Sequence, residues 1–164
     1  ATVRLRENSF PAGINAVIFL LHKPMGEGSR ENMLSFGDSR LDDFFDAAFK
    51  LKHPHKIGFD SCTVPAILGR REVDLRSIDS CEGARFSMYI SSDMIALPCS
   101  FDVDKKYGVS LKDASIKDAW ESDSFNAFRE SQLTACQGCE RRSVCFGGCP
   151  LDRSINLCGG ENGK

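Results

Sequence analysis

The sequence predicts an α+β fold in which a strand–helix–strand segment is followed by a small cysteine-rich domain. Two observations predict it. In residues 1–60, apolar residues recur with the periods of a buried strand and of an amphipathic helix. All eight cysteines then lie between Cys62 and Cys158, where only short elements are indicated. A chain of 164 residues, 41% of them hydrophobic, is long and apolar enough to bury an ordinary globular core.

The first sixty residues indicate one strand, one helix and a second strand. Residues 14–22 (INAVIFLLH) are mostly apolar, as in a strand that is covered on both faces. A helix is predicted from Ser39, because the apolar residues after it form one stripe, and Ser39 is the expected N-cap. The helix should end before Pro54, and residues 56–60 (KIGFD) predict the second strand.

This strand–helix–strand unit is too small to form a domain of its own. Two parallel strands with one helix cannot close a barrel or a doubly wound sheet. The chain also begins with Ala1 rather than Met. We therefore expect residues 1–60 to be the last piece of a longer protein's α/β portion.

Residues 61–164 predict a second unit with shorter elements. The expected elements are hairpin strands at 85–91 and 94–99 and helices at 114–120 and 123–131. Ser115 and Asp123 are the expected caps of the two helices.

The charge and hydropathy of the chain exclude several classes of function. A net charge of −2 gives no electrostatic basis for binding nucleic acid or an anionic membrane. The longest apolar run, residues 14–21, is too short to span a bilayer. Residues 4–10 lack the apolar stretch of a secretory signal, so we expect a cytoplasmic protein that binds neither nucleic acid nor membranes.

The eight cysteines could bind metal, form four disulfides or remain thiols, and a cytosolic chain of this length favours metal. Four of them have the spacing C-x2-C-x5-C-x3-C: Cys136, Cys139, Cys145 and Cys149. Zinc sites usually separate two ligand pairs by about a dozen residues or more, whereas the second and third cysteines here are much closer. The spacing instead resembles that of iron–sulfur ferredoxins. Zinc remains the alternative.

Eight thiolates are the number that two [4Fe–4S] clusters need. In two-cluster ferredoxins the cysteine before the proline binds the other cluster. Cys149 precedes Pro150 and is therefore predicted to turn away from its neighbours. The two expected ligand sets are Cys136, Cys139, Cys145 and Cys158, and Cys62, Cys81, Cys99 and Cys149. Gly138, Gly147 and Gly148 suit tight turns and would also let backbone N–H groups approach sulfur.

This spacing resembles that of the SPASM domain, the C-terminal auxiliary-cluster module of many radical S-adenosylmethionine enzymes. The family pattern begins with a cysteine, about nine to fifteen residues, a glycine, four residues and a cysteine. Cys81 and Cys99 fit this part, although Met94 stands in place of the glycine. The central C-x2-C-x5-C-x3-C follows at every spacing, and Cys158 closes the pattern. Cys62 can supply the further upstream ligand that members with two full clusters carry.

The resemblance covers about residues 60–160 and has implications for the architecture. It implies that residues 1–60 are the end of a partial (β/α) barrel and that residues 61–164 are the SPASM domain. The loop after the first strand would then lie at the side where barrel enzymes gather active-site groups. The residues that could face S-adenosylmethionine or substrate in this loop are His22, Lys23, Gly26 and Gly28. A simple Gly/Pro turn is an equally good interpretation.

The resemblance also implies a function. Such enzymes modify peptides or proteins, for example by crosslinking ribosomal peptides or maturing sulfatases, with a ferredoxin or flavodoxin as redox partner. Clusters held by all eight cysteines would transfer electrons, whereas a cluster without Cys62 would keep an open iron site for substrate. The sequence has no C-x3-C-x2-C motif for the catalytic cluster, so this chain alone is not expected to cleave S-adenosylmethionine. The alternatives are a ferredoxin-like electron carrier and a zinc-stabilised peptide-binding module.

Overall fold

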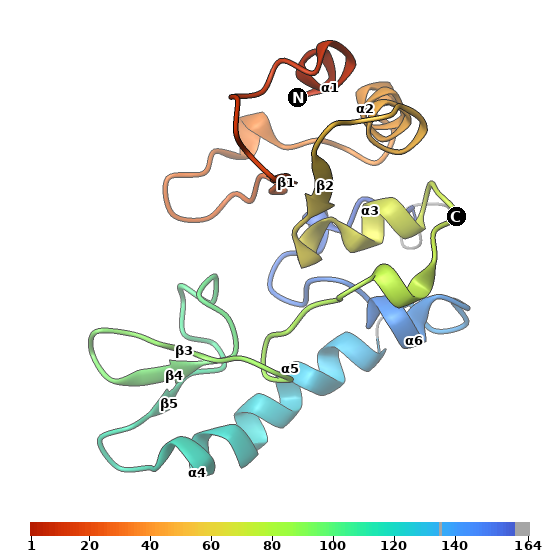
Figure 1. Cartoon of the computed structure of the whole chain (residues 1–164). Coiled ribbons are helices and arrows are strands. Elements are labelled where there is room, and N and C mark those ends of the chain that lie inside the picture. The colour runs from red at the N-terminus through yellow and green to blue at the C-terminus, as the bar shows by residue number, and fades with distance from the viewer. Residues whose placement is uncertain (135, 160–164) are drawn as a thin grey trace.

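A computed structural model describes residues 1–134 and 136–159 of the chain. Figure 1 shows two groups of elements with two short helices between them. The first group is α1 (Thr2–Glu7), β1 (Ala16–Phe19), α2 (Ser39–Lys50) and β2 (Lys56–Phe59). The second group is β3 (Tyr89–Ile90), β4 (Ile95–Leu97), β5 (Val109–Ser110), α4 (Ile116–Glu121) and α5 (Asp123–Thr134). The helices between the groups are α3 (Val64–Leu68) and α6 (Arg142–Cys145).

Short 3-10 turns complete the secondary structure, at Arg30–Asn32, Ser61–Thr63, Leu75–Ser77 and Arg153–Ile155. The arrangement of short helices and small sheets is compatible with the predicted α+β class. The end of the second predicted domain, residues 160–164, lies outside the described residues.

The predicted strand–helix–strand unit is confirmed. β1 pairs with β2 in parallel, with Val17 opposite Ile57, and α2 covers the pair through a phenylalanine cluster in which the rings of Phe44 and Phe19 lie 5.0 Å apart. The predicted cap is wrong by one residue. Asp38, not Ser39, caps α2, because the Asp38 carboxylate accepts the backbone N–H of Arg40 and also pairs with its guanidinium. The partial barrel stays a prediction.

The predicted hairpin is also confirmed, and it gains a third strand. β3 and β4 pair antiparallel, and β5 pairs with the other edge of β4. Met94 forms the turn with a φ of 63°, the left-handed conformation that glycine adopts more easily. The methionine that replaces the glycine of the family pattern thus adopts a conformation that glycine tolerates better.

One predicted cap of the two C-terminal helices is confirmed and the other is wrong. Ser115 caps α4 in a reciprocal box with Asp118. Asp123 lies inside the first turn of α5, and the hydroxyl of Ser122 accepts the N–H of Phe125 in its place. A capping residue lies just before the first helical residue and has a non-helical backbone, so that its side chain can accept an N–H of the first turn. Ser122 has this position, whereas Asp123 is already part of the helix.

Among the described residues the hydrophobic core forms three clusters, one of which joins the two predicted domains. Buried Leu41 and Phe45 of α2 pack with Ile67 of α3 and with Leu157 near the end of the described chain. Segments on both sides of residue 60 thus share one core, and the domain division stays a prediction. No helix within residues 1–134 and 136–159 is both long and apolar enough to cross a membrane.

Candidate functional site

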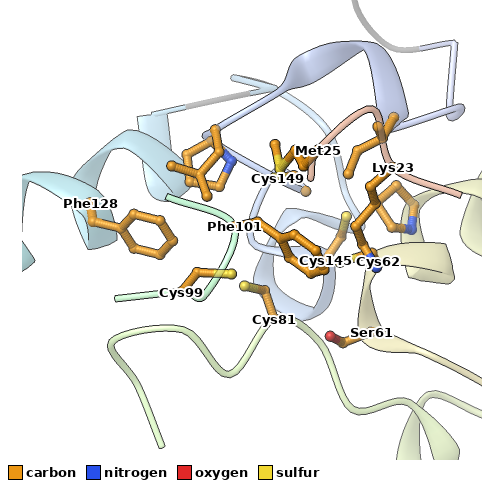
Figure 2. Close-up of a pocket in the computed structure, with 15 residues that line it drawn as sticks. Lys23, Met25, Ser61, Cys62, Cys81, Cys99, Phe101, Phe128, Cys145 and Cys149 are labelled. Carbon is orange, nitrogen blue, oxygen red and sulfur yellow. The ribbon is translucent and has the colours of Figure 1, made fainter. Parts of the chain in front are cut away.

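Five cysteines line one cavity, which we call the first cavity (Figure 2): Cys62, Cys81, Cys99, Cys145 and Cys149. Cys62 lies in the 3-10 turn that leads into α3, and Cys99 follows β4 after one proline. Cys149 follows α6, and Figure 2 shows the sulfur atoms of Cys81 and Cys99 turned toward each other. The first cavity therefore exists only when both groups of elements are in place.

Partial burial perturbs the pKa values of three thiols of the first cavity. It raises the pKa of Cys62 to about 12, against the opposing influence of Lys23, and the neighbouring Cys149 and Cys81 add to the rise. Burial also raises the pKa values of Cys99 and Cys149. These cysteines are therefore protonated at neutral pH, and a metal centre that binds them must displace their protons.

Backbone N–H groups point at two of these sulfur atoms. The N–H of Phe101 donates to the sulfur of Cys99. Those of Leu151 and Asp152 donate to the sulfur of Cys149. Such hydrogen bonds favour the thiolate over the thiol, and in iron–sulfur proteins they help to set the reduction potential.

Four cysteines line a neighbouring second cavity: Cys136, Cys139, Cys145 and Cys158. Cys139 is exposed, unlike the other seven cysteines, which are partly buried. Burial raises the pKa of Cys145 to about 11, with contributions from Cys158 and Cys136, while N–H groups of Gly147 and Gly148 donate to its sulfur. Cys145 borders both cavities.

The loop between Cys145, which borders both cavities, and Cys149, which borders the first cavity, is held by two side chains of the turn that follows it. The side-chain oxygen of Asn156 accepts the N–H of Cys149 at 2.7 Å, and Arg153 donates to the carbonyl of Gly147 at 2.8 Å. Gly147 and Gly148 have φ values of 83° and 73°, which supports their interpretation as turn residues whose N–H groups face sulfur. Sequence reasoning missed Asn156 and Arg153. The sequence signal that could have indicated Asn156 is its place as a polar residue between two apolar residues, Ile155 and Leu157, both of which are buried.

The donor set suits an iron–sulfur centre. Within the two described ranges, no three His, Cys, Asp or Glu side chains converge closely enough to hold a single metal ion. The thiols line the walls of two adjoining cavities, and thiolate is the usual ligand of iron–sulfur clusters. Whether each of the eight cysteines is a ligand stays a prediction.

The loop predicted to face S-adenosylmethionine or substrate contributes to two different places. Lys23 borders the first cavity. His22 borders an apolar pocket beside α2, and its ring Nε2 lies 2.8 Å from the carbonyl of Ser29. Gly26 has a φ of 60°, and a Cβ on Gly28 would lie 2.0 Å from the carbonyl oxygen of Lys23. The glycines thus suit a tight turn, and a contact with S-adenosylmethionine stays a prediction.

The cysteine-rich part of the chain matches a known family. The family model of SPASM, described as an iron-sulfur cluster-binding domain, matches residues 81–140. The chain contains a SPASM domain. The matched segment holds two cysteines of each cavity: Cys81, Cys99, Cys136 and Cys139. The chain matches no curated protein and no solved structure.

The match explains why thiols gather between the two groups of elements. A SPASM domain binds iron–sulfur clusters, and the matched segment carries the hairpin, α4 and α5, which place Cys99 and Cys136 at their ends. The remaining cysteines of the two cavities lie outside the matched residues but border the same space: Cys62, Cys145, Cys149 and Cys158.

Proposed function

We propose that the chain is the auxiliary-cluster portion of a cytoplasmic radical S-adenosylmethionine enzyme that modifies a peptide or protein. The observation that carries this proposal is the first cavity, where four cysteines distant in sequence border one space. The SPASM match at residues 81–140 supports it independently. Residues 1–60 supply a parallel strand pair with its helix, as the end of a partial barrel would.

In this proposal the two cavities hold one [4Fe–4S] cluster each. The first cavity supplies Cys62, Cys81, Cys99 and Cys149, and the second supplies Cys136, Cys139, Cys145 and Cys158. Full ligation by protein favours electron transfer over direct binding of substrate to iron. When bound, such clusters supply one-electron transfer over a wide range of potentials.

The residues of this chain have three tasks in that function. They hold sulfur in two groups, they exclude water from the first cavity, and they donate N–H groups to Cys99, Cys145 and Cys149. The catalytic cluster and most of the S-adenosylmethionine site would belong to a barrel that these residues complete. A ferredoxin or flavodoxin would deliver or remove electrons.

Anaerobic reconstitution with iron and sulfide tests the proposal. We expect about eight iron atoms and about eight acid-labile sulfides per chain, because each [4Fe–4S] cluster holds four of each. A content of one or two zinc ions that iron cannot replace would contradict it and favour the zinc-stabilised peptide-binding module. Two full clusters without any effect of a peptide substrate on their spectra would favour a ferredoxin-like electron carrier.

A further inference from the structure

Lys23 is a largely buried cation at the edge of the first cavity. Only 11% of its side chain is exposed, and its ammonium donates to the Asp60 carboxylate at 2.7 Å. The same nitrogen lies 4.7 Å from the centre of the Phe101 ring, within the range of a cation–π interaction. Figure 2 shows Lys23 and Phe101 beside Cys62.

The position of this ammonium is set by the ends of the two parallel strands. Asp60 directly follows β2, and its other carboxylate oxygen accepts the N–H of Leu21 at 3.2 Å and the hydroxyl of Thr63 at 2.5 Å. Lys23 follows β1 by a few residues. The carboxylate is thus tied to three neighbours, and it holds the lysine against the cavity rather than in solvent.

The ammonium and the thiol of Cys62 border the same cavity and interact electrostatically. The ion pair with Asp60 at 2.7 Å favours the charged form of this lysine. Cys81, Cys99 and Cys149 border the same cavity, so a positive charge lies next to the four thiols that we assign to one cluster.

We propose that Lys23 is a positioning residue that makes the cluster of the first cavity easier to reduce, by holding its positive charge at the edge of that cavity beside Cys62. This inference rests on the proposed function, because it requires a cluster in that cavity. Reduction adds one electron from the reductant to the cluster, which makes its charge more negative. A fixed cation in a site of low dielectric constant stabilises the more negative state.

The second cavity provides an internal reference. Lys23 does not border it, whereas Arg141 and Arg142 do, at the start of α6. A change at Lys23 should therefore move the reduction potential of one cluster and leave the other in place. An effect through general loosening of the fold would move both.

The test is an anaerobic redox titration of the reconstituted chain with dithionite, followed by electron paramagnetic resonance. In Lys23→Met, we expect one of the two cluster couples to shift to more negative potential. At a fixed potential the reduced-to-oxidised ratio of that cluster should fall about tenfold, which corresponds to about 59 mV for a one-electron couple. Lys23→Arg, which keeps the charge, should restore most of the wild-type potential.

Lys50→Met is the matched control. Lys50 also pairs with an aspartate, at 2.9 Å from Asp46, but its side chain is 68% exposed on the surface of α2. Removing it deletes the same charge and should leave both potentials unchanged. Lys23→Gln is a second neutral variant that can still donate to Asp60, in case the methionine is poorly tolerated.

Three outcomes would overturn the inference while leaving the proposed function in place. The first is an unchanged potential in both neutral variants, and the second is an equal shift of both clusters. The third is loss of one cluster from both neutral variants, which would make Lys23 a residue for assembly only. If the wild-type chain takes up no iron and sulfide at all, the proposed function fails instead.

Discussion

The two cysteine cavities are neighbours, but the chain builds them in different ways. Three cysteines of the second cavity come from one stretch of ten residues around α6. Those of the first cavity come from four separate segments, and the ends of β1 and β2 supply Lys23 and Asp60 beside them. The first cavity therefore depends on the tertiary fold, whereas the second depends mainly on one loop.

This difference predicts which cavity a destabilising substitution will disrupt. A change that loosens the packing between the two groups of elements should affect the first cavity before the second. A change within the loop that joins Cys145 to Cys149 should affect both, because Cys145 borders both cavities. The following predictions test that contrast.

The largest effect is expected for Gly148→Ala. The residue has a φ of 73°, and a Cβ there would lie 2.3 Å from the side-chain oxygen of Asn156, which holds the N–H of Cys149. Backbone strain and overpacking together should lower the free energy of unfolding by about 3 kcal/mol. Urea denaturation of the metal-free protein under reducing conditions measures this change.

Gly138→Ala is the control for this prediction. Gly138 has a φ of 83°, but nothing lies within 4 Å of a Cβ built there. Only backbone strain remains, so we expect a loss of about 1 to 2 kcal/mol. Equal losses in the two variants would show that the contact with Asn156 does not fix the loop.

An intermediate effect is expected from pH. Burial raises the pKa of Cys62 to about 12 and that of Cys145 to about 11, from a usual value of 9.0. The unfolded chain releases these protons at lower pH than the folded chain does. The thiols' contribution to stability is therefore complete below about pH 9 and is lost as the pH rises toward 11 and 12.

Urea midpoints of the metal-free protein between about pH 8 and about pH 10.5 check this sign. The fall should be shallower in Cys62→Ala than in Cys139→Ala, because Cys139 is exposed. An equal fall of the urea midpoint in both variants would mean that Cys62 is no more deeply buried than the exposed Cys139.

The smallest effect is a gain, expected for Met94→Gly. Met94 adopts a φ of 63° in the turn that leads to Cys99, and its side chain is 48% exposed. Glycine relieves the left-handed strain and gives up little buried surface, so we expect stability to rise by about 1 kcal/mol. A thermal melt of the metal-free protein measures it, and a fall in melting temperature would mean that the methionine contributes through packing.

Much of the fold could be predicted because its signals are local. The apolar stripe of α2 and the two short strands beside it follow from periodicity within single segments. α3 was missed because it is five residues long, although Pro65 in its first turn was a usable signal. β5 was missed because its two residues are too few to show alternation, and only its pairing with β4 defines it.

The site divides in the same way. The spacing around Cys136 could be interpreted directly, since neighbours in sequence must lie close together in space. The interpretation of Lys23 as a residue facing S-adenosylmethionine used only its place after a strand, and no pattern indicates that Asp60 holds it against Cys62. Contacts between residues far apart in the chain leave no signature in one sequence.

The most direct test of the two-cluster assignment compares two double variants by iron analysis and Mössbauer spectroscopy of anaerobically reconstituted protein. Cys99→Ala with Cys149→Ala removes two ligands from the first cavity only, whereas Cys145→Ala with Cys149→Ala removes one from each. The account predicts that the first pair keeps about four irons as one intact [4Fe–4S] cluster and that the second pair keeps no fully ligated cluster. An intact cluster in the second pair, or its absence from the first, would contradict the assignment.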